Sequence, residues 1–249
     1  MGESATRTAP QHGGTDDRAA GGRAGQMLSG LVVALGLVLF LAGFGWGAVV
    51  YRPYTVPTGS MSPTIEAGDR VLAQRVDGDE IRRGDVVVFK DPNWANAPVV
   101  KRVVAVGGDT VACCTEGMLT VNGKQIEEPY LPEGEPAESI AFPTVTVPEG
   151  RLFLLGDERH GSLDSTAHLQ DAASGSVARS AVSGRVDAVV WPMNGLLERP
   201  TGFQALGSEL SEPGPYQVIV YMILGGAVLV LLGAAYGPIA KRVGGTRGR

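Results

Sequence analysis

The sequence predicts a mainly β protein, in which a folded, barrel-like antiparallel sheet is flanked by two transmembrane helices. Two observations support this fold class. Apolar runs without any charge lie near both ends of the 249-residue chain. Between them, short runs rich in β-branched residues alternate with turn signals, a pattern typical of a barrel or folded sheet. No long amphipathic helical pattern interrupts that region.

The first apolar run extends from Met27 to Val50 and contains no charged residue. A helix of this length spans the roughly 30 Å hydrocarbon core of a bilayer. The alternative is a cleaved signal peptide, but its apolar region would be only about 7–15 residues long and would precede an A-x-A-like site. We therefore predict a transmembrane helix over residues 27–50, preceded by a disordered cytoplasmic tail over residues 1–26.

The second apolar run begins at Tyr216 and ends before Lys241, and it lacks the polar face of a buried core helix. It predicts a transmembrane helix over residues 216–240 and a basic cytoplasmic tail over 241–249. Arg18 and Arg23 precede the first span, and Lys241 and Arg242 follow the second. The positive-inside rule therefore predicts a multi-pass protein of the cytoplasmic membrane, with both termini cytoplasmic and residues 51–215 outside.

Composition limits the partners and cofactors that we expect. The formal net charge of −5 gives no reason to expect nucleic-acid binding. The two cysteines, Cys113 and Cys114, are adjacent, and zinc needs more ligands at wider spacing. The pair is either a strained disulfide between neighbours or two thiols at a strand end. We expect no metal and no cofactor.

The region between the apolar runs contains several strand-like segments separated by turns. Asn122-Gly123 predicts a two-residue hairpin. Residues 133–143 are interpreted as a loop insertion and residues 162–183 as a long irregular loop. The predicted strands are 71–73, 85–89, 99–106, 119–121, 145–147, 151–155 and 186–191.

A serine-containing turn follows the first apolar run, with the sequence TGSMSPT over residues 58–64. Alone, this segment also fits an ordinary loop. Three further motifs follow in order: GDVVVFK at 84–90, KRVVAVGGD at 101–109 and GDERHGSLDS at 156–165. With the membrane span just upstream, the chain from about Arg52 to Pro192 resembles the bacterial type I signal peptidases, which are membrane-bound serine endopeptidases.

The resemblance implies that Ser60 is the nucleophile and Lys101 the general base. A serine hydroxyl needs a nearby base, and a lysine becomes a base only when burial lowers its pKa. Lowering that pKa from about 10.4 to about 7 or 8 disfavours the charged form by roughly 4 kcal/mol. The valines around Lys101 provide such surroundings, and Arg102 should point to the opposite face. The alternative is an edge-strand lysine that faces solvent.

The resemblance also assigns supporting roles. The backbone N–H of Ser60 and the hydroxyl of Thr58 would form the oxyanion hole. Ser162 would orient the lysine amine, while Arg159 and Asp164 would hold the loop and the site together. The alternative for these loop residues is a polar turn beside the sheet.

The last motif departs from the family pattern at three positions. Glu158 stands where Asn is usual, Gly161 where Asn is common and Thr166 where Arg is common. These departures leave the rigidity of the loop in doubt, but they do not affect Ser60, Lys101 or Ser162.

By the same resemblance, the substrates are membrane-tethered secretory pre-proteins with small residues at the first and third positions before the cut. We expect Met61, Ile65, Val86 and Val103 to line the substrate pockets, with a packing role as the alternative for Met61. The lipid bilayer is the other partner, because it confines enzyme and substrate to one surface and raises their effective concentration.

Three alternatives remain open at this stage. His160 or His168 with Asp164 or Asp171 would give a Ser–His–Asp triad. A self-cleaving repressor-like switch shares the fold, but it would be soluble and carry a DNA-binding domain. A catalytically inactive membrane-bound paralogue acting as a scaffold would tolerate the altered last motif.

Overall fold

The computed structural model describes residues 16–95, 97–132, 140–207 and 209–245, with the backbone alone described for 16–24 and 237–245. The chain divides into two compact units. One unit combines Met1–Trp46 with Gln217–Arg249, and the other contains Gly47–Tyr216.

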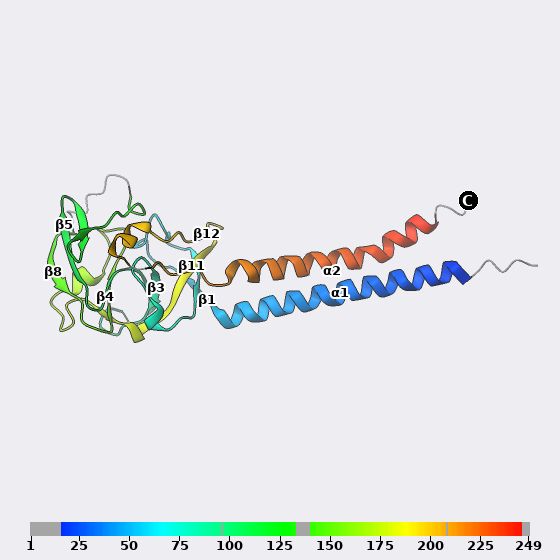
Figure 1. The fold of residues 1–249 in the computed structure, drawn as a ribbon, viewed down its shortest axis with the longest axis horizontal. Helices are drawn as coiled ribbons and strands as arrows, with labels where there is room; N and C mark the ends of the chain where they lie inside the picture. Colours follow the sequence, from blue (N-terminus) through cyan, green and yellow to red (C-terminus); the bar gives the residue numbers. More distant parts are fainter. Residues whose placement is uncertain (1–15, 96, 133–139, 208, 246–249) are drawn as a thin grey trace, which may run out of the picture. The chain divides into compact units, whose positions relative to one another are not determined.

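The first unit contains most of the helices α1 (Asp16–Val50) and α2 (Tyr216–Gly245), which run side by side (Figure 1). Their apolar portions, Gly25–Val50 and Tyr216–Tyr236, are long enough to cross a membrane. Only 11% and 17% of these portions are buried, whereas the core helix of a soluble protein would be mostly buried. The helix α1 begins at Asp16, inside the stretch that we expected to be disordered, and residues 1–15 lie outside the described part.

Glycines allow the two helices to approach closely. A Cβ atom on Gly36 would lie 2.8 Å from the carbonyl oxygen of Gly226, and one on Gly43 would lie 2.9 Å from Cβ of Met222. The hydroxyl of Ser29 donates a hydrogen bond of 2.6 Å to the Gly233 carbonyl. Small residues and interhelical hydrogen bonds of this kind are typical of helix pairs in membranes.

The second unit is built from two antiparallel sheets, which confirms the mainly β fold (Figure 1). The larger, 8-stranded sheet has the order β1-β2-β11-β3-β4-β9-β10, with β12 paired to β11, and the smaller sheet has the order β7-β6-β5-β8. The strands of the larger sheet are β1 (Tyr51–Thr55), β2 (Arg70–Gln74), β3 (Val86–Phe89), β4 (Val99–Val106), β9 (Arg151–Leu155), β10 (Val177–Ala178), β11 (Val182–Trp191) and β12 (Gly195–Leu196). Those of the smaller sheet are β5 (Thr110–Thr115), β6 (Met118–Val121), β7 (Lys124–Gln125) and β8 (Phe142–Thr146).

Each predicted strand corresponds to a strand of the structure, and β4 and β9 match the predicted bounds. The hairpin between β6 and β7 is also confirmed, since Asn122 and Gly123 both have positive φ, 53° and 73°. The segment 162–183 is more regular than expected, because it contains the 3₁₀ turns η3 (Ser165–His168) and η4 (Arg179–Ala181) as well as β10. Further 3₁₀ turns are η1 (Gly78–Glu80) and η5 (Thr201–Leu206). Of the predicted loop insertion, residues 133–139 lie outside the described part.

The strands β1 and β5 were not predicted. Pro53 lies in the middle of the short β1, and β5 carries the adjacent cysteines. The sulfur atoms of Cys113 and Cys114 lie within bonding distance, so the structure has the disulfide alternative. The central strand β4 is buried along most of its length and presents Lys101 and Arg102 on opposite faces.

Candidate active site

Ser60 lies in a tight turn between β1 and β2, and buried neighbours hold this turn in place. Met61 and Ile65 are fully buried and form an isolated β-bridge. The amide of Ser62 donates to the carbonyl of Gly59 at 2.9 Å, which closes the turn around Ser60. The serine itself is half-buried, so its hydroxyl is fixed in direction but remains accessible.

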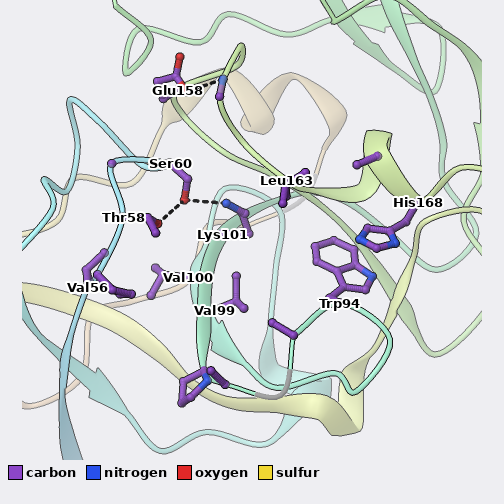
Figure 2. Close-up of a pocket in the computed structure, with 17 residues that line it drawn as sticks. Val56, Thr58, Ser60, Trp94, Val99, Val100, Lys101, Glu158, Leu163 and His168 are labelled. Carbon is purple, nitrogen blue, oxygen red and sulfur yellow. Dashed lines mark hydrogen bonds between the residues drawn. The ribbon is translucent and has the colours of Figure 1, made fainter.

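Lys101 projects from β4 toward Ser60, and its Nζ atom lies 2.6 Å from Ser60 Oγ (Figure 2). The lysine is only 2% exposed. Burial lowers its pKa from 10.5 to about 8, although the nearby carboxylates of Asp164, Asp157 and Glu158 act in the opposite direction. A substantial share of Lys101 is therefore neutral at mildly alkaline pH and able to accept a proton.

Arg102 points to the other face of β4, as predicted, but it is buried and paired. Its Nε and Nη2 atoms donate to the two carboxylate oxygens of Asp157 at 2.8 and 2.6 Å. Its guanidinium lies 3.8 Å from the ring centre of Tyr130, and Nη1 donates to the Gly84 carbonyl at 3.0 Å. Asp157 follows the end of β9, so this bidentate pair joins that end to the strand that carries Lys101.

Two hydrogen-bond donors face the space next to the Ser60 hydroxyl. The hydroxyl of the exposed Thr58 lies 3.4 Å from Ser60 Oγ (Figure 2). The backbone N–H of Ser60 makes no hydrogen bond to any described residue. The Ser60 amide is thus available to a ligand oxygen beside Ser60, and the Thr58 hydroxyl would turn from Ser60 Oγ to reach it.

The loop after β9 is fixed around Gly156 from both sides. Asp164 accepts a hydrogen bond from the Gly156 amide at 3.0 Å, and Arg159 Nε donates to the Gly156 carbonyl at 3.0 Å. A Cβ atom at position 156 would collide with Ser162 Oγ and with the carbonyl oxygen of Ser60. Only glycine therefore allows the loop to pack this closely behind the nucleophile's turn.

Ser162 is close to the pair, but it does not make the predicted contact. Its hydroxyl is buried and has no hydrogen-bond partner among the described residues, so no bond to Lys101 is present. The same hydroxyl packs against Gly156, on the side where the Ser60 carbonyl also lies.

The three departures from the family pattern are integrated into the loop by hydrogen bonds. Glu158 Oε2 accepts from the Gly161 amide at 2.6 Å, and the Glu158 amide donates to the Ser60 carbonyl at 3.3 Å. The Thr166 hydroxyl donates to Asp164 at 2.7 Å. Sequence reasoning left the rigidity of this loop in doubt, and these contacts support an ordered loop.

A cavity of about 780 Å³ opens beside Ser60 and Lys101. Its wall is largely apolar, with Val56, Val99, Val100 and Leu163 around the pair and Trp94 further away (Figure 2). Among the described residues, no cluster of His, Cys, Asp and Glu side chains is suited to hold a metal ion.

A family model described as signal peptidase, peptidase S26, matches residues 26–191. The chain belongs to this family. A probable signal peptidase I from Mycobacterium leprae is 33% identical over 240 residues, covering 74% of this chain and 79% of that protein. A signal peptidase I from Bacillus licheniformis is 33% identical over 178 residues, covering 68% and 89%. The chain is thus a serine peptidase of the signal peptidase I type.

Among solved structures, a signal peptidase I from Enterococcus faecalis is 28% identical. It matches 42% of this chain and 95% of its own, with a TM-score of 0.34.

The predicted substrate-pocket residues of this signal peptidase are not on the cavity. Met61, Ile65, Val86 and Val103 are all fully or almost fully buried, and none of them lines it. Their side chains point into the core instead. The wall is formed by the start of β4, by the segment before Ser60, by the β3–β4 connection and by the loop after β9.

The histidine alternative is only partly assembled. His168 lines the same cavity, pairs with Asp171 at 2.9 Å and stacks on Trp94 with ring centres 4.7 Å apart. Among the described residues, however, Ser60 Oγ makes hydrogen bonds only to Lys101 and Thr58. His160 is exposed, and Asp164 accepts hydrogen bonds from its own loop.

Proposed function

We propose that this signal peptidase cleaves through a Ser60–Lys101 dyad. The observation that carries the proposal is the 2.6 Å contact between Lys101 Nζ and Ser60 Oγ, made by a lysine that is almost completely buried. Among the described residues no carboxylate forms an ion pair with this amine, which is suited to accept the serine proton because desolvation disfavours its charged form.

In the proposed mechanism, neutral Lys101 takes the proton of Ser60 while Oγ attacks the scissile carbonyl carbon. The Thr58 hydroxyl and the Ser60 amide donate to the oxyanion of the tetrahedral intermediate. The Lys101 ammonium then protonates the leaving amine as the C–N bond breaks, which leaves an ester on Ser60. Neutral Lys101 next removes a proton from water, whose oxygen attacks the ester, and the Lys101 ammonium returns that proton to Ser60 Oγ as the ester C–O bond breaks and the acid leaves. Arg159 and Asp164 hold the loop at Gly156 by hydrogen bonds, and Ser162 packs against it, so that the loop stays in place next to the turn of Ser60.

The proposed substrates are membrane-tethered secretory pre-proteins, cut on the outer face of the cytoplasmic membrane. Two apolar helices flank the β domain, and basic residues lie beyond them at both ends of the chain. This arrangement supports cytoplasmic termini and an external β domain that is tethered to the bilayer.

The test is to incubate the full-length protein in lipid vesicles with a pre-protein and to identify the product's new N-terminus. We expect one cut after a small residue in the wild type and none in Ser60→Ala. Ser183→Ala, an exposed serine on β11, is the matched control and should cleave normally. Absence of product from the wild type as well would favour the inactive scaffold.

A further inference from the structure

Glu158 presents a fixed carboxylate to the cavity, next to the nucleophile's turn. It lines the cavity together with Ser60 and Lys101. Two contacts hold it: its amide donates to the Ser60 carbonyl at 3.3 Å, and Oε2 accepts from the Gly161 amide at 2.6 Å. The other oxygen, Oε1, has no hydrogen-bond partner among the described residues. Glu158 thus places a half-buried carboxylate, with one oxygen unengaged, at the edge of the cavity.

The apolar wall and the acid lie on opposite sides of Ser60 (Figure 2). Val56, Val99 and Val100 form a surface suited to small apolar side chains, which the proposed function assigns to the residues before the cut. The scissile bond of a bound substrate lies at Ser60. If the substrate residues before the cut lie on the apolar wall, the residues after the cut lie on the opposite side of Ser60, where Glu158 is.

The other charges near the pair are already engaged. Asp157 is bonded to Arg102, and Asp164 accepts from the amides of Gly156 and Thr166; both acids are fully buried. His168 is paired with Asp171 beyond Trp94. Two carboxylates close to Ser60 in the described chain stay within reach of a bound peptide: Glu158, which lines the cavity, and the exposed Glu66, which accepts from the Ser62 hydroxyl at 2.7 Å and does not line it.

We propose that Glu158 is a specificity-determining residue that favours positive and disfavours negative charge in the first two residues after the cut. This inference rests on the proposed function, because it assumes cleavage at Ser60. An ion pair in a partly exposed cleft is weak, and so is the repulsion of like charges, so each changes the rate by at most about fivefold. Together they give a preference for Lys over Glu of about tenfold.

The experiment uses three otherwise identical pre-protein substrates with Lys, Gln or Glu at the second position after the cut. The full-length enzyme in neutral-lipid vesicles is assayed for kcat/KM on each substrate. The wild type should prefer Lys over Glu by about tenfold, and E158Q should bring the ratio close to one. Comparing substrates within one variant at one pH cancels any change in folding or in the reactivity of Lys101. E149Q removes the same charge outside the cavity and should keep the wild-type ratio.

A second measurement needs only the wild type: in about 1 M salt its ratio should fall toward one, because screening weakens partly exposed charges. Equal cleavage of the three substrates by the wild type would overturn the inference while leaving the proposed function intact. An unchanged ratio in E158Q, or a ratio insensitive to salt, would also overturn it. Absence of cleavage of all three by the wild type would overturn the proposed function first.

Discussion

The buried Lys101 predicts a steep rise of activity with pH. If the free enzyme requires neutral Lys101 and its pKa is about 8, only about 1% of the enzyme is active at pH 6 and about half at pH 8. The value of kcat/KM should therefore rise about 50-fold between these pH values and level off above pH 9. The assay is cleavage of one uncharged peptide by the full-length enzyme, with tryptophan fluorescence recorded at each pH to verify that the fold is unchanged.

The pH at which activity reaches half of its maximum distinguishes a lysine base from the histidine alternative. A histidine base with an ordinary pKa would place the midpoint near about 6.5, and activity would be almost constant above pH 8. A midpoint in that lower range, or a profile that is flat from pH 6 to pH 8, would refute the assignment of Lys101.

Three further predictions concern the groups around the pair. Lys101→Met should remove activity but raise the free energy of unfolding at pH 7 by about 3 kcal/mol, because the folded state no longer buries a charge. The pKa of Lys101 is lower in the folded than in the unfolded state, so the stability gained by Lys101→Met is full below about pH 8 and disappears as the pH rises toward 10.5. Thermal unfolding of the wild type and the variant at pH 7 and near pH 10.5 measures this gain. Asp157→Asn should lower the free energy of unfolding by about 3–5 kcal/mol, since it leaves Arg102 buried without its carboxylate. Gly156→Ala should abolish cleavage, because its methyl group would collide with the Ser162 hydroxyl, and kinetics with circular dichroism can separate this loss from unfolding.

Each of these predictions has an outcome that contradicts it. A Lys101→Met protein that unfolds earlier than the wild type at pH 7 would show that the lysine is not buried as a costly charge. Unchanged stability in Asp157→Asn would mean that the Arg102 pair contributes little. Normal cleavage by Gly156→Ala would show that the loop can move away from the turn, and Gly45→Ala provides a control at an exposed position of α1 with nothing within 4 Å.

The sequence alone sufficed for much of the β domain, because continuous apolar runs specify the buried strands. The strand β4 carries valines on both faces and is buried on both, so its bounds could be read directly. The pairing of Ser60 with Lys101 came from the order of the motifs rather than from spacing, since 41 residues separate them. Strand β1 gave no such signal, because Pro53 and polar neighbours mask a short strand that is held by pairing with β2.

The cavity wall could not be predicted in the same way. Trp94 comes from the β3–β4 connection and His168 from η3, and they meet only because the two segments fold against each other. Similarly, the burial of Arg102 depends on Asp157, which lies 55 residues away. A local pattern indicates that a charged residue is on a strand, but it does not show which distant carboxylate compensates its burial.

The most direct test of the Ser60–Lys101 dyad is to compare the cleavage rates of Lys101→Ala and His168→Ala on one pre-protein in lipid vesicles. Lys90→Ala, an exposed lysine directly after β3, is the matched control. The dyad predicts a loss on the order of a thousandfold in Lys101→Ala, with His168→Ala and Lys90→Ala remaining active. Cleavage that survives in Lys101→Ala and disappears in His168→Ala would contradict it.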